Sequence, residues 1–199
     1  MKYRKTVLKL FVAVCFLVTT SNLWSGEPGE LVKEVILKDT SLKLEEMTKE
    51  RKRKVWDEMS YAFNFEDITK NVMGKHWEKF TNEGKKEFLE IFIRYLKESY
   101  AIKSSHRFGE KIISLKEKQG SERARVQVEL VKRTEGKVLV DFILLRKNGK
   151  WQIYDVIIEG VSIANNYRQQ IHSFCVKHSY EELVKKLKQE QFKNEAANY

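Results

Sequence analysis

An asparagine–glycine pair at 148–149 lies between two long apolar segments, and it limits the possible folds more than any other feature of the sequence. Asn-Gly is the strongest two-residue signal for a tight β-hairpin, because both positions accept a positive φ. The flanking segments, 138–145 and 151–158, carry apolar side chains toward both faces of the predicted strands. Each face must therefore be covered. Helices can cover one face, and the other is either solid core or the wall of a cavity.

The segment before the hairpin predicts a further strand. Residues 125–130 alternate strictly between polar and apolar, which is typical of a strand with one buried face. We expect Glu135-Gly136 to turn this strand into the next, so that the strands form an antiparallel meander. Residues 102–115 show no clear period, and an additional strand there stays an open alternative.

Four helices are predicted before the sheet from apolar periodicity. Pro28 suits a first helical turn, a second helix is expected over about residues 44–61, and Asn64 and Thr81 cap the third and fourth. The fourth is the longest, and its large apolar residues recur every four positions: Phe88, Phe92, Leu96 and Tyr100. Further apolar side chains flank this stripe, which predicts a helix that packs on more than one side.

Two more helices are predicted after the hairpin. One runs from Val161 to Val176, and Ser179 with Glu182 forms a capping box that opens the other. Helices, an antiparallel sheet and again helices within 199 residues favour an α+β fold. We assign it to a single domain over residues 26–199.

Residues 1–25 have the layout of a secretory signal peptide. A basic start is followed by nine apolar residues at 10–18 and then by small and polar residues. Nine residues are too few to span a bilayer, which requires about 20. We expect this segment to be cleaved on export, which leaves Cys175 as the single cysteine and excludes an intrachain disulfide.

The net charge of the whole chain is +10, but residues 1–25 hold four Lys or Arg residues and no Asp or Glu, so the remainder carries +6. The most basic segment, residues 49–54, contains no aromatic residues of the kind that stack on bases. We interpret it as a solvated helix face and expect no nucleic-acid partner.

No motif in the sequence specifies a catalytic or metal site. The spacing His172-x-x-Cys175-x-x-His178 resembles a ligand set, but on a helix these side chains diverge, whereas structural zinc needs four converging ligands. The alternative to a binding protein is a cavity enzyme or small-molecule binder that uses Asp141, Tyr154 or Asp155. The aspartates are explained more simply as solvent-facing or cation-paired residues, and we expect no enzyme activity, no metal and no cofactor.

Residues 148–162 (NGKWQIYDVIIEGVS), followed by NYRQQ at 166–170, resemble the signature of the MlaC family. These are periplasmic phospholipid-binding, or toluene-tolerance, proteins that serve an ABC transporter in Gram-negative bacteria. Residues 63–68 (FNFEDI) and the helix after Thr81 look like the helical half of the same family, and the resemblance spans about residues 28–190. It implies an NTF2-like twisted sheet, covered by N- and C-terminal helices around an apolar cavity for acyl chains.

The resemblance also implies a function. A member of this family shuttles phospholipid between an outer-membrane lipoprotein complex and an inner-membrane MCE-domain protein with its ABC transporter, and so maintains the lipid asymmetry of the outer membrane. Exposing a 16-carbon acyl chain to water costs roughly 13 kcal/mol at ~0.8 kcal/mol per methylene. A lipid therefore crosses an aqueous compartment only inside a carrier with a dry cavity.

The candidate lining residues come from the long helix and the hairpin: Phe92, Leu96, Tyr100, Phe142, Leu144, Tyr154, Val156 and Ile158. The candidates that would close the mouth follow the hairpin: Val161, Ile163 and Tyr167. Arg168 is a candidate for the lipid phosphate, with an ion pair to Glu159 as the alternative. Strand alternation shows which residues share a face, but not which face lines the cavity.

Overall fold

The computed structural model describes residues 27–40, 48–103, 111–131 and 136–196. The predicted signal peptide lies outside these residues, and so does Glu135, the first residue of the predicted Glu135-Gly136 turn. The described strands form one antiparallel sheet in sequential order: β1 (Lys111–Gln119), β2 (Arg123–Val131), β3 (Lys137–Lys147), β4 (Lys150–Ile158) and β5 (Val161–Ser162). The meander predicted from the sequence is confirmed, and the ambiguous region supplies the edge strand β1.

The hairpin between β3 and β4 turns at Asn148-Gly149, as predicted. Both residues have a positive φ, 52° and 77°, and Lys147 pairs with Lys150 across the turn. The register then aligns Phe142 with Val156 on the inner face. It shifts between Ile143 and Leu144, a bulge that bends the pair.

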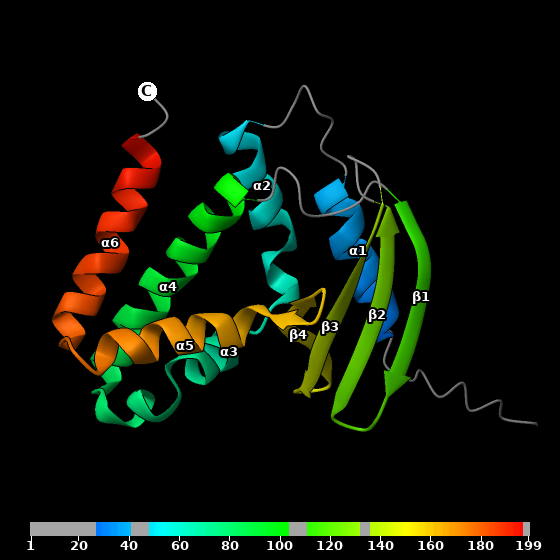
Figure 1. Cartoon of the computed structure of the whole chain (residues 1–199). Helices are drawn as coiled ribbons and strands as arrows, with labels where there is room; N and C mark the ends of the chain where they lie inside the picture. The colour runs from blue at the N-terminus through cyan, green and yellow to red at the C-terminus, as the bar shows by residue number, and fades with distance from the viewer. Residues whose placement is uncertain (1–26, 41–47, 104–110, 132–135, 197–199) are drawn as a thin grey trace, which may run out of the picture.

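Helices precede and follow the sheet (Figure 1). Their bounds are α1 (Pro28–Thr40), α2 (Lys49–Met59), η2 (Ser60–Ala62), α3 (Phe65–Met73), η3 (Gly74–Lys79), α4 (Asn82–Lys103), α5 (Ile163–Cys175) and α6 (Tyr180–Ala196). The predicted caps are present: Asn64 accepts from the Asp67 backbone N–H, and Thr81 accepts from the Gly84 backbone N–H. Ser179 and Glu182 form the reciprocal capping box.

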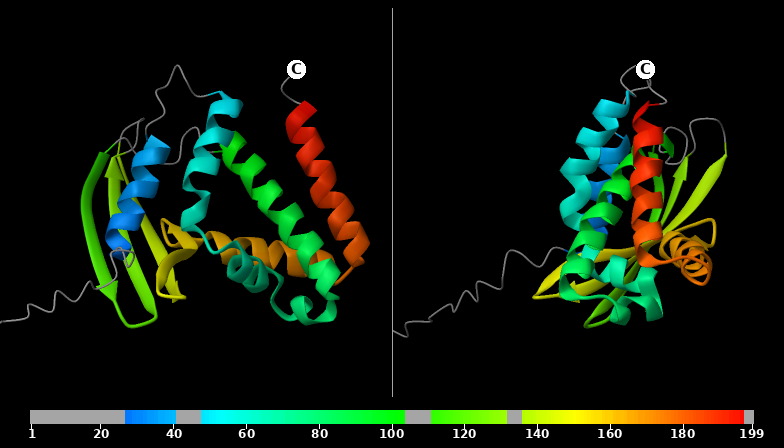
Figure 2. Two further views of the ribbon diagram at one scale, coloured as in Figure 1. Left: turned by 180° about the vertical axis from the view of Figure 1, so that it is seen from behind. Right: turned by 90° about the vertical axis from the view of Figure 1, so that its left-hand side faces the viewer.

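The helices divide between two regions, which the left-hand view of Figure 2 separates clearly. Helix α1 packs on the sheet, whereas α4 and α6 stand away from it, with α3 and α5 beneath them. Two hydrophobic cores follow this division. The sheet core joins the inner face of the sheet to α1 and α2, and the helical core joins α3, α4, α5 and α6.

Two local predictions are wrong. Val161 was expected to begin the last-but-one helix, but it pairs with Ile158 in the short strand β5, and Ser162 caps α5 instead. The basic segment at 49–54 is not a fully solvated face. Lys52 is only 4% exposed, and Arg53 forms two hydrogen bonds, of 2.8 and 2.6 Å, with the buried carboxylate of Glu98 on α4. Helix α2 packs against both α1 and α4, and these contacts bury part of the basic segment.

Candidate functional site

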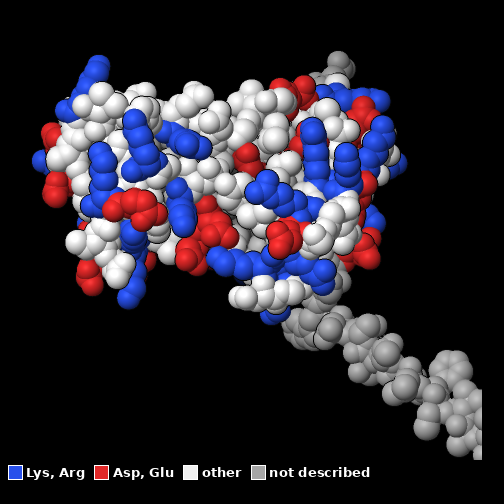
Figure 3. All heavy atoms as spheres, turned by 90° about the horizontal axis from the view of Figure 1, so that it is seen from below, with Lys and Arg blue, Asp and Glu red and all other residues white. Residues whose placement is uncertain are grey.

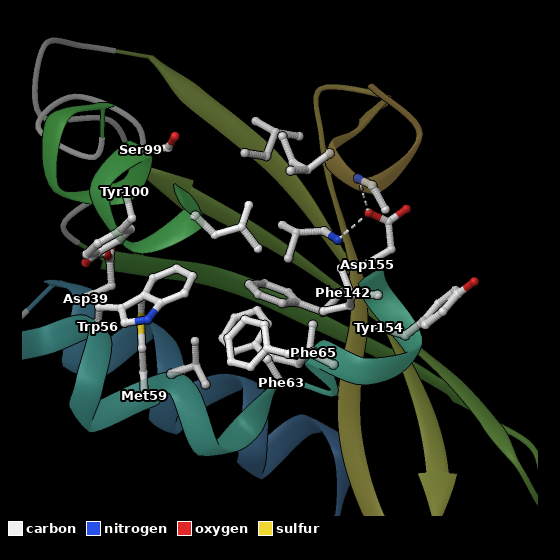
Figure 4. Close-up of a pocket in the computed structure, with 18 of the residues that line it drawn as sticks. Asp39, Trp56, Met59, Phe63, Phe65, Ser99, Tyr100, Phe142, Tyr154 and Asp155 are labelled. Carbon is white, nitrogen blue, oxygen red and sulfur yellow. Dashed lines mark hydrogen bonds between the residues drawn. The ribbon is translucent and has the colours of Figure 1, made fainter. Parts of the chain in front are cut away.

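A pocket with a volume of about 190 Å³ lies where the sheet core meets the helical core (Figure 4). Its walls come from both regions, because α1 and α2 supply one side, α3, α4 and α5 another, and β3 and β4 the floor. Leu96 on α4 contacts both cores and lines the pocket between them. The lining is almost entirely apolar, so the pocket favours a hydrocarbon over a polar ligand.

The floor of the pocket is set by strand alternation. Phe142 on β3 and its register partner Val156 on β4 both face inward, and Ile158 follows two positions later on the same face. Ile153 extends this surface toward the N-cap of α3, where the Asn64 backbone N–H donates to the Ile153 carbonyl at 2.9 Å. This hydrogen bond holds the segment between α2 and α3 against the sheet.

A cluster of aromatic rings forms the wall opposite α5. Trp56 lies at its centre, with ring centroids 5.6 Å from those of Phe65 and Tyr100 and 6.3 Å from that of Phe63. Phe63 stacks in turn on Phe65 at 5.8 Å. Rings at these separations pack favourably and present flat apolar surfaces to the pocket.

The two carboxylates that line the pocket, Asp39 and Asp155, both accept hydrogen bonds. The Tyr100 hydroxyl donates to the carboxylate of Asp39, the last-turn residue of α1. At the other end, Asp155 accepts from the backbone N–H groups of Val156 (2.8 Å) and Ala164 (3.0 Å) and from the Ser162 hydroxyl (2.5 Å). Asp155 therefore anchors the first turn of α5 to β4.

Eight of the candidate residues line this pocket: Leu96, Tyr100, Phe142, Tyr154, Val156, Ile158, Ile163 and Tyr167. Three others lie elsewhere. Phe92 is fully buried in the helical core, where it stacks on Phe88, and Leu144 is fully buried in the sheet core, paired with Ala124 and Ile153. Val161 is 58% exposed on β5.

The environments of Asp141 and Tyr154, two of the residues considered for acid–base chemistry, differ. Asp141 lies on the outer face of the sheet, where Arg125 donates two hydrogen bonds of 2.8 Å to it and Gln127 donates one of 3.0 Å. The hydrogen bonds from Arg125 hold the pKa of Asp141 below its usual value. Burial, followed by the charge of Asp155, raises the pKa of Tyr154, so its hydroxyl stays protonated at neutral pH.

Arg168 does not line the apolar pocket. It lies on a neighbouring face of α5, in a separate polar hollow together with His76 and His172. Glu159, the alternative ion-pair partner considered for Arg168, instead accepts a hydrogen bond from the backbone N–H of Leu139 at 2.7 Å.

Sequence reasoning missed the contribution of the N-terminal helices to the pocket. The additional lining residues are Val35, Ile36, Asp39, Trp56, Met59, Phe63, Phe65, Ile68, Ser99, Ile153, Asp155 and Ala164. The closely spaced aromatics Trp56, Phe63 and Phe65 were the available signal, because three large rings within ten residues need a common apolar site.

The described residues contain no group of three or more His, Cys, Asp or Glu side chains that could hold a metal ion. His172 bonds to His76, and His178 stacks on Phe174 with centroids 4.2 Å apart, so the sequence motif does not converge. Within the same described part of the chain, every helix is too short or too polar to cross a membrane.

Comparison with solved structures identifies the fold. The phospholipid-binding protein from Ralstonia solanacearum, solved in complex with a phospholipid, superposes with a TM-score of 0.67 at 17% identity. The match covers 83% of this chain and 94% of that one. No curated protein matches the sequence. A model of the MlaC protein family matches residues 32–189, most of the chain, which confirms the resemblance seen in the hairpin and in α5. By that match, and with the fold in agreement, this chain belongs to the MlaC family.

Proposed function

We propose that this protein is a non-enzymatic phospholipid carrier that holds acyl chains in the apolar pocket between its two cores. The observation that carries the proposal is the pocket itself, which is lined by aromatic and aliphatic side chains from both cores. Family membership and the fold shared with a phospholipid-binding protein support it. Eight of the residues expected from the sequence are proposed as acyl-chain contacts on this basis, together with the aromatic wall around Trp56.

The cellular route is part of the same proposal. The predicted signal peptide would deliver the chain to the periplasm, where it would exchange lipid with an outer-membrane lipoprotein complex and with an inner-membrane MCE-domain protein and its ABC transporter. Shielding a 16-carbon chain from water is worth roughly 13 kcal/mol. Release therefore requires a partner or a membrane that offers the chain a comparable apolar environment.

The pocket also argues for binding rather than catalysis. Its carboxylates among the described residues are Asp39, which accepts from Tyr100, and Asp155, which accepts two hydrogen bonds from the start of α5 and one from β4. A general acid or base needs a carboxylate oxygen that is free to exchange a proton with the substrate. Both carboxylates instead hold helices in place around the cavity.

Native mass spectrometry of the purified protein, expressed with its signal peptide and followed by lipid extraction, tests the proposal. We expect a stoichiometric phospholipid adduct. Val156→Arg, which places a charge in the pocket, is expected to abolish the adduct, because burying an unpaired cation among hydrocarbon is strongly unfavourable.

Ile157→Arg is the matched control. Ile157 is the next residue of β4, pairs with Asp141 and lies on the outer sheet face, so this variant is expected to retain lipid. Circular dichroism verifies that both variants fold, and Val156→Trp, which fills the pocket without a charge, replaces Val156→Arg if that variant does not fold. A protein that stays empty after incubation with vesicles, or lipid retained by every folded pocket variant, would refute the proposal.

A further inference from the structure

A second hollow, of about 220 Å³, lies between α5 and η3. The residues of α5 that face it (Asn165, Arg168, Gln169 and His172) alternate with those that line the acyl pocket (Ile163, Ala164 and Tyr167). The two cavities thus lie on different faces of one helix. From η3, Lys75 and His76 complete the polar lining, and no carboxylate belongs to it. The hollow is rich in hydrogen-bond donors and has no anionic group of its own.

The two cations of the hollow lack partners within the described residues. Neither Lys75 nor Arg168 forms an ion pair or a hydrogen bond there. Elsewhere, Lys and Arg side chains commonly lie beside Asp and Glu, as the face of the molecule drawn in Figure 3 shows. Gly74 has a φ of 52°, and a Cβ at this position would lie 3.1 Å from the Arg168 Nε. The absence of a side chain at Gly74 therefore lets the guanidinium lie directly against the backbone of η3.

His76 and His172 form a directly bonded pair in the wall of the hollow. The His76 Nε2 and the His172 Nδ1 are 2.9 Å apart, and His76 is only 8% exposed. A neutral pair holds two ring protons, of which one lies in the hydrogen bond and the other on an outer nitrogen. Uptake of one more proton keeps the hydrogen bond and gives both outer nitrogens an N–H donor.

Burial and the neighbouring positive charges oppose protonation of His76. Burial lowers the pKa of His76, and so do the charges of His172, Lys79 and Lys75. No acidic group acts on His76 from η3 or from α5. An anion between Lys75 and Arg168 would reverse this balance, because a negative charge nearby favours the protonated imidazole.

We propose that this hollow binds a phosphate group, and that binding is coupled to proton uptake by the His76–His172 pair. Lys75 and Arg168 supply the charge-assisted hydrogen bonds, Asn165 and Gln169 supply neutral donors, and the protonated pair supplies the rest. The phosphate belongs either to a lipid headgroup or to a free phosphate ion. The site is separate from the acyl pocket, so the proposal does not depend on lipid carriage.

Isothermal titration of the full protein tests the site with three probes. Inorganic phosphate and glycerophosphoglycerol, a headgroup without tails, distinguish the two sources: binding of the second supports a lipid headgroup, and binding of inorganic phosphate alone supports the free ion. Sulfate keeps a constant charge between about pH 5 and pH 8, so any proton taken up when it binds is bound by the protein and not by the anion. We expect tighter sulfate binding at about pH 6 than at pH 7.5, and a net proton uptake that is measured by comparing buffers of different ionisation enthalpy.

Matched variants assign the effect to the hollow. Lys75→Gln and Arg168→Gln are each expected to weaken binding about tenfold, whereas Lys116→Gln on β1 removes the same charge elsewhere and leaves the affinity unchanged. His76→Asn is expected to remove the proton uptake, with His172→Asn as a second variant if His76→Asn does not fold. His178→Asn, which changes a histidine outside the hollow, keeps the uptake. Failure of all three probes to bind, or equal weakening by Lys75→Gln and Lys116→Gln, overturns the proposal.

Discussion

The carboxylate of Asp141 is buried on the outer face of the sheet, with the residue only 4% exposed, and it accepts three hydrogen bonds from Arg125 and Gln127. Replacement by Asn removes the charge that these donors compensate. We expect Asp141→Asn to lower the free energy of unfolding by about 1–3 kcal/mol at neutral pH. Urea denaturation measures the difference.

The same substitution changes the response to acid. The pKa of Asp141 is lower in the folded state than in the unfolded chain, so its contribution is complete above the unfolded value of about 3.9 and declines as the pH falls through the folded value. The stability gap between wild type and Asp141→Asn should therefore narrow below about pH 4. A gap that stays constant in that range would contradict this assignment.

His76 predicts a pH dependence of the same sign as that of Asp141, but at a higher pH. Its pKa is lowered in the folded protein, so the unfolded chain binds more protons below about pH 6.5 and stability falls as the pH falls through this range. His76→Asn should show a smaller loss of stability between about pH 7 and pH 5 in a buffer without phosphate or sulfate. His178→Asn is the control, and an unchanged pH profile in His76→Asn would rule out this role.

At single positions, the sequence predicted which side chains share a face of the sheet, but not which of them reach the pocket. Phe142 and Leu144 are two residues apart on one strand and both point inward, as alternation requires. Only Phe142 reaches the pocket, because the cavity ends before Leu144, where Ala124 and Ile153 complete the packing. The extent of a cavity depends on side chains from other elements, and a strand pattern carries no information about them.

Among the elements, the β3–β4 hairpin depends on backbone conformations that its two turn residues make accessible. Gly149 has a φ of 77°, a region that a residue with a Cβ enters at a cost of about 1–2 kcal/mol. We expect Gly149→Ala to destabilise the protein by about 1 kcal/mol in thermal or urea unfolding. Gly120, in the β1–β2 connection, lacks a positive φ and has room for a Cβ, so Gly120→Ala should be neutral or slightly stabilising. Equal effects of the two substitutions would contradict the argument.

Helix α5 depends on Asp155 for its position against the sheet. Asp155→Ala removes two hydrogen bonds at the start of α5, from the Ser162 hydroxyl and the Ala164 backbone N–H, and one from the backbone N–H of Val156 on β4. We expect a loss of about 1–2 kcal/mol in stability. Because Ile163, Ala164 and Tyr167 form one wall of the pocket, lipid should also dissociate faster, as followed with a fluorescent phospholipid. Asp155→Asn keeps an oxygen for the backbone N–H groups and should retain most of both properties. A loss of lipid exchange in Asp155→Asn with unchanged stability would instead favour a chemical role.

Element prediction succeeded where a local signal agrees with the tertiary packing. The Asn148-Gly149 turn, the Asn64 cap and the Ser179 capping box are local features, and each is present in the structure. Strand β1 was ambiguous because it is a lysine-rich edge strand whose outer positions are exposed, so its apolar alternation is weak. Val161 was assigned to a helix because the two-residue strand β5 is too short to produce a period.

At the scale of the whole molecule, the pocket is small for its proposed ligand. Its volume of about 190 Å³ is below the roughly 300–1,000 Å³ typical of ligand pockets, so uptake of a complete acyl chain requires the two cores to separate. We expect amide exchange in α3 and α5, which border the pocket from the helical core, to slow about tenfold on lipid loading. Exchange in β1 and β2, which do not contribute to the pocket, should change little. Hydrogen-exchange mass spectrometry of loaded and lipid-free protein measures both, and uniform slowing would argue against separation at the pocket.

The division into two cores has a consequence for the lifetime of the protein in the cell. If the pocket holds lipid as proposed, a lipid-free molecule lacks the ligand that joins the sheet core to the helical core. It would then open more often along that boundary and offer more chain to proteases. Molecules that hold lipid are correspondingly protected. On the proposed function, the steady-state amount of the protein would depend on the supply of lipid as well as on its rate of synthesis, and molecules without lipid would be degraded first.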